Sequence, residues 1–488
     1  MRLWSRGRVS ALLGAFVVAL CVAGTAVAQS GEDEEALLTL SRETWSGDLD
    51  GIVERGFLRM ATAYNPLFFS YDGIERSGIL YDIALELEKY LNEKHAPKGK
   101  KIAVVIMPMP RDQILPSVIE GRADVAAANL TITPERAEQV AFSEPTYKEV
   151  SELVITGPAA PSIASFDNLV ETEVHVRESS SYFEHLTALN AKREADGKDP
   201  IPIEAADERL EDYDLLEMVE SGIIPAVIVD SHKAALWSQI FENITVHEEL
   251  AVNSGGEIAW VVRQDSPELL ASVNTFVDTI RKGSMVGNVL IKRHFGGKTW
   301  VDNVTRGDAR SRYEDTVDII KAFSEKYDFD WLMITAQAYQ ESRLDQSKRS
   351  HAGAVGIMQV LPTTAADPNV GIPDINDPEN NVHAGVKYLR FLREQYFDDP
   401  EIEPVDQILL SFGAYNAGPG NISKARKRAV KMGLDPNKWF GNVEVAAGRA
   451  ISREPVIYVR NIYKYYVAYK HMEEARLERA QAVDAAAQ

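Results

Sequence analysis

Glu341 is the residue best suited to chemistry, because it ends an otherwise uncharged stretch, Trp331–Glu341. A carboxyl group reached from an apolar helix loses hydration, so its pKa rises and it stays protonated near neutral pH. A protonated carboxyl is what a general acid needs in order to give a proton to a glycosidic oxygen. This passage therefore predicts the acid of a sugar-cleaving site.

Residues that could form a glycan-binding cleft with such an acid follow later in the chain. In chain order they are Ser342, Met358, Gln359, Tyr415 and Asn416. Glycines in the turn 353–359 allow the backbone to approach a ligand closely. Amide and phenol groups form hydrogen bonds to sugar hydroxyls, although Tyr415 and Asn416 also fit the end of a helix before Gly-Pro-Gly.

No second carboxylate is placed with comparable clarity. Asp345 falls in a loop, and Asp367, Asp374 and Asp377 have the setting of turn residues. Glycoside hydrolases usually need a second carboxylate as nucleophile or base. A site with one carboxyl would leave the role of nucleophile to a group of the substrate held nearby, because proximity can replace a protein group. The sequence therefore does not show the carboxylate pair that a hydrolase needs.

The residues that would position this site are predicted to be helical. Apolar residues recur with helical spacing over 313–327, 331–342, 382–396, 404–417 and 457–470. The basic stretch 424–431 is either a solvated helix face or a contact for an anionic polymer. The charged, alanine-rich residues from 471 onward are expected to fray as a polar tail.

Together these passages resemble the catalytic domain of the soluble lytic transglycosylases, goose-lysozyme-like enzymes that cut bacterial peptidoglycan. The spacing from Glu341 to the turn 353–359 follows that family, and the segment 377–385 resembles its next helix start. The resemblance makes Glu341 the catalytic acid and Ser342 a partner of the catalytic loop. Met358 and Gln359 would line the groove.

The same resemblance assigns Tyr415 and Asn416 to the glycan beside the scissile bond, and makes Tyr458 the group that positions the catalytic carboxyl. One departure concerns the last motif, which in the family is commonly Glu-Thr followed by any two residues and then Tyr-Val. Here Pro455 replaces the threonine, so a hydroxyl and a backbone donor are missing.

The first half of the chain alternates short apolar strands with amphipathic helices. Strands are expected at 58–62, 101–107, 123–128, 224–229 and 258–262, and helices at 80–91, 113–120 and 267–282. Such alternation predicts parallel sheets that helices cover on both faces.

A ligand site is predicted where polar residues follow these strands. Asn129 and Thr131 stand at a strand end, where α/β folds place ligands. Arg136 offers a planar fork for a carboxylate, or else an ion pair within a helix capped by Thr133. Asp230 ends a strand of the second half of this domain, where it could receive an ammonium group.

These passages resemble the type-3 solute-binding proteins, two-lobed receptors for amino acids, over about 50–298. The resemblance assigns Asn129, Thr131 and Arg136 to a ligand's carboxylate and Asp230 to its amine. An aromatic cluster, Tyr64, Phe68, Phe69 and Tyr71, either stacks on a ligand or belongs to the core. The predicted fold is multidomain: a two-lobed α/β domain like the periplasmic binding proteins, then a mostly α, lysozyme-like domain.

Charge is unevenly distributed over the 488 residues, whose net charge is −21. Between residues 29 and 298 there are 25 lysines and arginines against 46 aspartates and glutamates, whereas from 299 onward there are 24 against 27. Such a chain is a poor partner for nucleic acid. The nearly neutral second part can still approach an anionic polymer such as peptidoglycan.

The first 28 residues have the charged start, apolar run and small-residue end of a secretory signal peptide. The single cysteine, Cys21, lies inside this segment and lacks the small preceding residue that lipid attachment would want. The mature chain is therefore expected to have no thiol, disulfide or cysteine-based metal site. The predicted limits are signal peptide 1–28, acidic lead-in 29–49, solute-binding domain 50–298, linker 299–312, catalytic domain 313–470 and polar tail 471–488.

This order of domains resembles the membrane-bound lytic transglycosylases of type F. It implies a periplasmic enzyme, with peripheral outer-membrane attachment left open, that cuts glycan strands without water and leaves 1,6-anhydro-muramic acid ends. No cofactor or metal is expected, and the first domain would bind a small amino acid or muropeptide and regulate cleavage. The alternatives are an inactive receptor that docks on the wall and a hydrolytic lysozyme.

Overall fold

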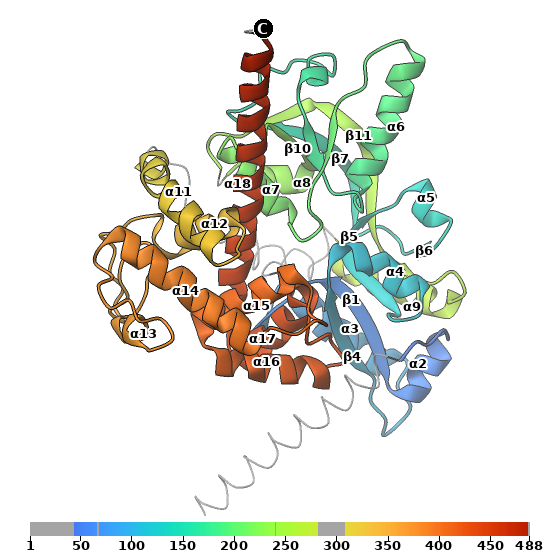
Figure 1. Cartoon of the computed structure of the whole chain (residues 1–488). Coiled ribbons are helices and arrows are strands. Elements are labelled where there is room, and N and C mark those ends of the chain that lie inside the picture. Colours follow the sequence, from blue (N-terminus) through green and yellow to red (C-terminus); the bar gives the residue numbers. More distant parts are fainter. Residues whose placement is uncertain (1–42, 66–67, 240, 282–307, 487–488) are drawn as a thin grey trace, which may run out of the picture.

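The computed structural model describes residues 43–65, 68–239, 241–281 and 308–486. They form two domains, 43–281 and 308–486, drawn in Figure 1 in blue to green and in yellow to red. The predicted signal peptide, most of the lead-in and the linker up to residue 307 lie outside the described residues.

The first domain is built on one mixed sheet whose strand order is β4-β1-β5-β11-β7-β10-β8-β9, with β6 paired to β11. The strands are β1 Phe57–Ala63, β4 Ala103–Met109, β5 Val125–Thr131, β6 Ala141–Phe142, β7 Tyr147–Thr156, β8 Val174–Val176, β9 Ile203–Ala205, β10 Ala226–Asp230 and β11 Thr245–Val262. A separate hairpin joins β2 Ser70–Asp72 to β3 Glu75–Ser77.

The expectation of purely parallel sheets is wrong at the centre of this sheet. β1 pairs in parallel with β4 and β5, and β8 does so with β9 and β10. Between them, β11 pairs antiparallel with both β5 and β7. The long strands β7 and β11 pass through both lobes, and register shifts along β11 allow it to bend between the lobes.

Helices cover the sheet of each lobe. Lobe 1 holds β1, β4 and β5, and lobe 2 holds β8, β9 and β10. The helices are α2 Leu49–Arg55, α3 Ile79–Lys94, η1 Arg111–Gln113, α4 Ile114–Ile119, α5 Pro134–Ala137 and α9 Pro267–Ile280 around lobe 1, and η2 Leu169–Glu171, α6 Ser181–Ala195, α7 Asp212–Glu220 and α8 Ser231–Trp237 around lobe 2.

The second domain is helical in its described part. Its helices are α11 Asp308–Lys326, α12 Trp331–Ser342, α13 Pro362–Ala366, α14 Pro378–Tyr396, α15 Pro404–Ala417, α16 Pro419–Lys431, the π-helical turn η3 Trp439–Val443, α17 Glu444–Ala450 and α18 Arg453–Ala486. Helix α11 starts at Asp308, inside the predicted linker.

The expected frayed tail is also wrong, since α18 continues to Ala486. Its last part is rich in alanine, glutamate and arginine, which are strong helix formers. It extends a helix already held by packing, so no new nucleation is needed. Pro455 is the third residue of α18, where the first turn has no intrahelical partner for a backbone N–H.

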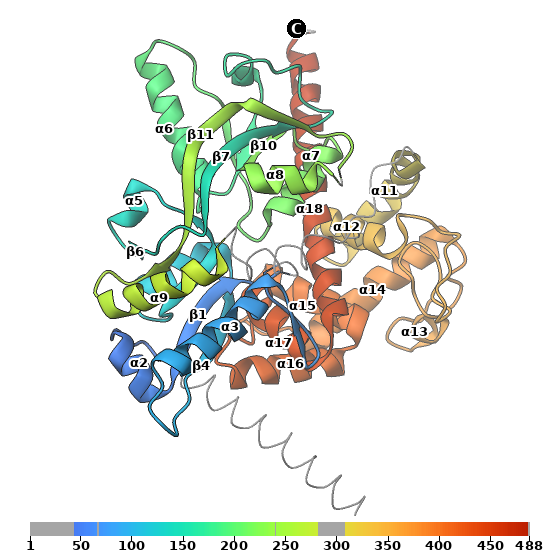
Figure 2. The same ribbon diagram turned by 180° about the vertical axis from the view of Figure 1, so that it is seen from behind.

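Helix α18 is also where the two domains meet. In both Figure 1 and Figure 2 its middle runs between α12 and lobe 2 of the first domain. Arg209 of lobe 2 donates to the Tyr463 hydroxyl at 2.7 Å. The buried Lys464 forms an ion pair with the half-buried Glu217 of α7 and lies 3.9 Å from the buried Asp214.

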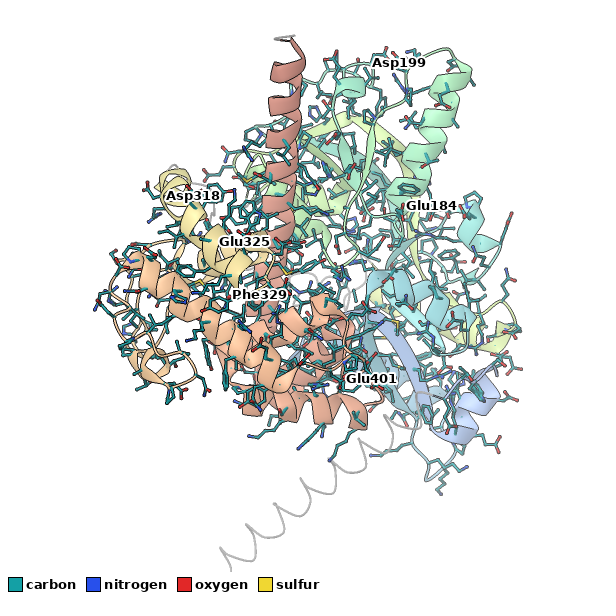
Figure 3. All side chains as sticks on the ribbon, in the orientation of Figure 1. Glu184, Asp199, Asp318, Glu325, Phe329 and Glu401 are labelled. Atoms are coloured by element: carbon teal, nitrogen blue, oxygen red, sulfur yellow. The ribbon has the colours of Figure 1, made fainter. Side chains whose placement is uncertain are left out.

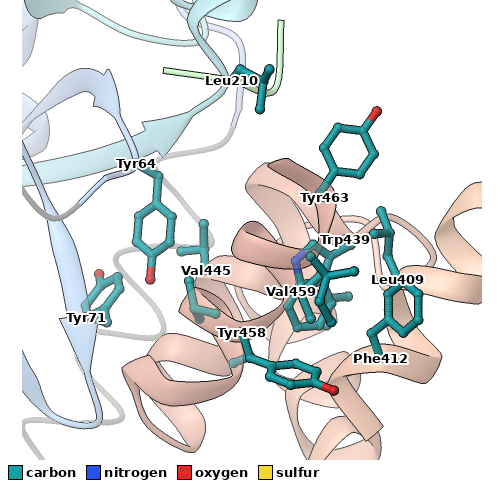
Figure 4. Packing of buried hydrophobic residues seen from close by; sticks show 14 of the residues in the cluster. Tyr64, Tyr71, Leu210, Leu409, Phe412, Trp439, Val445, Tyr458, Val459 and Tyr463 are labelled. Carbon is teal, nitrogen blue, oxygen red and sulfur yellow. The ribbon is translucent and has the colours of Figure 1, made fainter. Parts of the chain in front are cut away.

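Lobe 1 contacts α17 and α18 through residues from the predicted aromatic cluster. Tyr64 and Tyr71 are buried, and Figure 4 shows them facing the helix that carries Val445. A side chain at Gly448 would lie 2.3 Å from the Tyr64 hydroxyl, so this glycine permits the close approach. The two tyrosines therefore belong to a core that continues from one domain into the other.

This shared core leads to a prediction about Lys464, which is 7% exposed. We expect Lys464→Met to lower the unfolding temperature of the full chain by a few degrees, because removing one partner leaves buried carboxylates without compensation. Calorimetry measures the shift. Lys470→Met is the matched control, since Lys470 lies on the same helix with a side chain that is 56% exposed. Equal temperatures for both variants would mean that the pair does not hold the domains together.

Candidate active site

Helix α12 carries Glu341 in its last turn. Asp330 caps the start of the helix by accepting from the Leu332 backbone N–H at 2.8 Å. The helix ends because Arg343 and Leu344 both adopt left-handed backbone angles, with φ of 58° and 62°. The apolar face of α12 is buried, while Glu341 is only partly buried at its rim.

The environment of Glu341 fits a group that changes protonation near neutral pH. Burial raises its pKa from 4.5 to about 7. The Tyr458 hydroxyl on α18 donates to its Oε1 at 2.6 Å, and this bond and the Lys348 charge act in the opposite direction. Because the pKa lies near 7, the carboxyl can give up a proton and later take one back.

Gln337 is a neighbour that the sequence reasoning missed. It lies one turn before Glu341, is fully buried, and its amide Nε2 lies 3.3 Å from the Tyr458 hydroxyl. A donor on that oxygen directs the tyrosine's own hydrogen toward Glu341. The signal was present in the sequence, since Gln337 is a polar residue four positions from Glu341 on an apolar helix.

The turn after α12 is held by hydrogen bonds to buried side chains. The Ser342 hydroxyl donates to the Ile357 carbonyl at 2.8 Å and accepts from the Asp345 N–H at 3.0 Å. The Met358 N–H donates to the Asn381 side chain at 2.9 Å. Ser342 thus contacts the loop as the resemblance implies, through its hydroxyl, whereas Met358 is held through its backbone N–H and its side chain is buried.

Gln359, Tyr415 and Asn416 are partly exposed, as a glycan-binding role requires. Gln359 has a left-handed φ of 46°, and its amide donates to the Gly356 carbonyl at 2.8 Å. The Tyr415 hydroxyl donates to the Met358 carbonyl at 2.8 Å and so ties α15 to the turn. Burial and then the Glu341 charge raise the pKa of Tyr415.

The other candidate acids have structural partners of their own. Asp345 accepts from the Ser347 N–H at 2.9 Å. Asp367 accepts from the Asn369 N–H at 2.9 Å, and Asp377 caps α14. Asp374 is exposed. Three of these four aspartates thus hold local turns or a helix start, as predicted for turn residues.

The first domain brings its four predicted ligand residues together between the lobes. The Asn129 amide of lobe 1 donates to Asp230 Oδ2 of lobe 2 at 2.9 Å, and Arg136 lies against the Thr131 carbonyl at 3.4 Å. Two cavities adjoin them, of about 40 Å³ and about 140 Å³. Phe68 lines the larger cavity, unlike the buried Phe69.

The two charged residues predicted to bind the ligand, Arg136 and Asp230, already have partners from the chain itself. Arg136 Nε donates to Glu184 Oε1 at 2.7 Å, and Lys233 Nζ lies 2.7 Å from Asp230 Oδ2.

No helix in the described ranges is long and apolar enough to cross a bilayer. The same residues contain no group of three or more histidines and acids that could hold a metal.

Comparison with known proteins gives matches for both domains. Residues 318–435 match the Transglycosylase SLT domain, and residues 58–296 match the Bacterial extracellular solute-binding proteins, family 3. A membrane-bound lytic murein transglycosylase F from Desulfosudis oleivorans is 31% identical over 375 residues, which are 73% of this chain and 79% of that protein.

Proteins of the same name from other bacteria align over more of the chain. The one from Pseudomonas fluorescens Pf-5 is 28% identical over 455 residues and 88% of each sequence. Among solved structures, an ancestral arginine-binding protein bound to arginine is similar to 50% of this chain and covers 99% of its own, with 25% identity and a TM-score of 0.39.

Proposed function

Since the chain belongs to the membrane-bound lytic murein transglycosylase F family, we propose that it cuts the β-1,4 bond between N-acetylmuramic acid and N-acetylglucosamine with Glu341 as its acid. It is a peptidoglycan lytic transglycosylase with an N-terminal solute-binding domain. The observation that supports the catalytic assignment is the hydrogen bond of 2.6 Å from Tyr458 to a carboxyl whose pKa lies at about 7.

In the proposed reaction Glu341 gives its proton to the glycosidic oxygen, and the sugar that leaves carries that proton away. The muramic acid is left with a developing positive charge at its C1 carbon. The Glu341 carboxylate then takes the proton of the 6-hydroxyl of the same sugar, and that oxygen bonds to C1. A 1,6-anhydro ring forms, no water is consumed, and Glu341 ends in the acid form in which it began.

Tyr458 is proposed to position the carboxyl through its bond to Oε1, which leaves Oε2 to carry the proton. Tyr415, Asn416 and Gln359 are proposed to bind the glycan, because the resemblance assigns them to it and their side chains are partly exposed. The alternative of an inactive receptor is not favoured, since relatives over most of the chain are named as transglycosylases. We place the enzyme in the periplasm, exported by the segment 1–28.

This proposal predicts the pH dependence of cleavage. Glu341 must be protonated in the free enzyme, and its pKa is raised to about 7. We therefore expect kcat/KM on isolated sacculi to be highest below pH 7 and to fall tenfold per unit above it. Rates of muropeptide release between pH 5 and pH 9 measure this fall, which is the alkaline limb of the pH profile. A fall centred near pH 4.5 would contradict the raised pKa and with it the role of Glu341.

The first domain is proposed to bias this activity when it binds its ligand. Helix α7 begins in the cleft, where Asp212 pairs with Lys233, and its other residues contact Lys464 of α18. Six residues before Lys464, the same helix carries Tyr458. Movement of lobe 2 can thus reach the catalytic pair through two helices. A ligand can shift the rate only by as much as it prefers one arrangement over the other.

A further inference from the structure

The amine site predicted at Asp230 is filled by Lys233. The ammonium group of Lys233 lies 2.7 Å from Asp230 Oδ2, 2.7 Å from Asp212 Oδ2 and 2.9 Å from the Tyr182 hydroxyl. The ammonium group donates hydrogen bonds to Asp212 and Tyr182 and forms an ion pair with Asp230, so it has three oxygen partners. Lys233 thus occupies the position beside Asp230 that was predicted for the amine of a ligand.

Opening the cleft does not empty this site, because all of its members belong to lobe 2. Asp230 ends β10, Lys233 lies on α8, Asp212 begins α7 and Tyr182 lies on α6. Asp230 is 1% exposed and Asp212 is 7% exposed. An incoming amine would have to displace Lys233 and leave its charge without a partner, which is costly in a buried site.

The carboxylate site is held differently, because its ion pairs join the two lobes. Arg136 on α5 of lobe 1 pairs with Glu184 on α6 of lobe 2, where Figure 3 labels this glutamate. Arg111 of lobe 1 pairs with Glu211 of lobe 2 at 2.9 Å. When the lobes part, both guanidinium groups lose these partners. The side chain of Glu184 is 22% exposed and can turn to solvent.

The two cavities indicate what else the ligand carries. The cavity of about 40 Å³ holds Arg136, and the cavity of about 140 Å³ is lined largely by apolar and aromatic side chains such as Phe68, Ile79 and Trp237. Arg111, Asn129, Asp212 and Lys233 line both, so the cavities adjoin. An apolar cavity of about 150 Å³ is large enough for a benzene ring.

We propose that this cleft binds a carboxylate that carries an apolar or aromatic group and has no free amine. The carboxylate replaces Glu184 on Arg136, the apolar group fills the larger cavity, and Lys233 supplies the positive charge that a free amino acid would bring. Two sources share this chemistry: amino acids or peptides whose amine is acylated, and simple carboxylic acids. The inference rests on the proposed receptor role of the first domain and not on the catalytic assignment.

Calorimetric titration of the full chain tests this with three matched probes. N-acetyl-L-leucine represents the acylated source, 3-phenylpropionate the simple acid, and L-leucine the free amino acid. We expect at least one of the first two to bind ten times or more tighter than L-leucine, and the better of them identifies the source. L-leucine binding as tightly as both would overturn the proposal, and so would a failure of all three.

Two variants sharpen the result. Lys233→Met frees Asp230 and Asp212, so we expect L-leucine to bind at least tenfold tighter than it does to the natural chain. Arg136→Ala should abolish binding of whichever of the first two probes binds the natural chain, because both place their carboxylate on Arg136. If Lys233→Met does not fold, the ranking of the three probes on the natural chain still decides. Titration with muropeptides released from sacculi separates an error in the ligand class from an error in the receptor role. If muropeptides bind while the three probes fail, the proposed ligand class is wrong. If muropeptides also fail to bind, the proposed receptor role is wrong.

Discussion

Glu341→Gln is expected to reduce the release of muropeptides from isolated sacculi by a hundredfold or more. The amide has nearly the shape of the acid but cannot give up a proton, and loss of a general acid typically costs on the order of 10²–10⁴ in rate. The matched control is Glu325→Gln, which changes an exposed glutamate of the same domain, labelled in Figure 3. Near-normal rates in the Glu341 variant would remove the proposed acid.

Unfolding measurements on Glu341→Gln show whether the variant is folded and also test the raised pKa. The difference in stability between the variant and the natural chain should depend on pH. The folded-state pKa of Glu341 is raised to about 7, so the native state holds a proton that the unfolded state releases above about pH 4.5. The natural chain therefore loses stability between about pH 4.5 and pH 7. Glutamine carries no charge to bury. We expect the variant and the natural chain to have equal unfolding temperatures at pH 4. At pH 8 we expect the free energy of unfolding of the variant to be larger by on the order of 1 kcal/mol, after allowance for the partial exposure of Glu341.

Tyr458→Phe is expected to have the second largest effect. It removes the hydroxyl that donates to Glu341 Oε1 at 2.6 Å. That bond lowers the pKa of Glu341 against the effect of burial. Its loss should slow cleavage by roughly tenfold to a hundredfold and move the alkaline limb of the pH profile upward. Rates across pH 5 to 9 measure both effects.

Tyr469→Phe is the control for this variant, because it removes a hydroxyl from the same helix at a residue that stacks on Tyr313 instead. It should leave the limb in place. A Tyr458→Phe enzyme that is slower but has an unchanged limb would mean that the tyrosine contacts the glycan and does not act on the carboxyl.

The features best predicted from sequence are those set by local pattern. Helices 331–342 and 404–417 have the predicted limits, since each has a clear start and an apolar period that stops at a glycine or a left-handed residue. The predicted fold class and family are confirmed by the domain matches and relatives. The domain limits and the site residues remain predictions.

The features that escaped prediction depend on partners far apart in the chain. Nothing local shows that Lys233 would turn to Asp212, or that Glu184 would reach Arg136 across the lobes. The central antiparallel pairing of β7 and β11 likewise joins segments separated by a whole lobe. The prediction of a frayed tail at 471–486 was wrong for a different reason. A segment of polar residues needs no apolar stripe to be helical when it extends a helix that is already docked.

The measurement that tests the central claim most directly is the mass of the muropeptides that the full chain releases from sacculi, before and after treatment with borohydride. A single-carboxyl site that uses the substrate's own hydroxyl predicts 1,6-anhydro-muramic acid ends, whose masses borohydride leaves unchanged. Each is lighter by one water and two hydrogens than the reduced product of a hydrolase. Predominantly reducible ends would contradict the account, because they require an activated water and a second base beside Glu341.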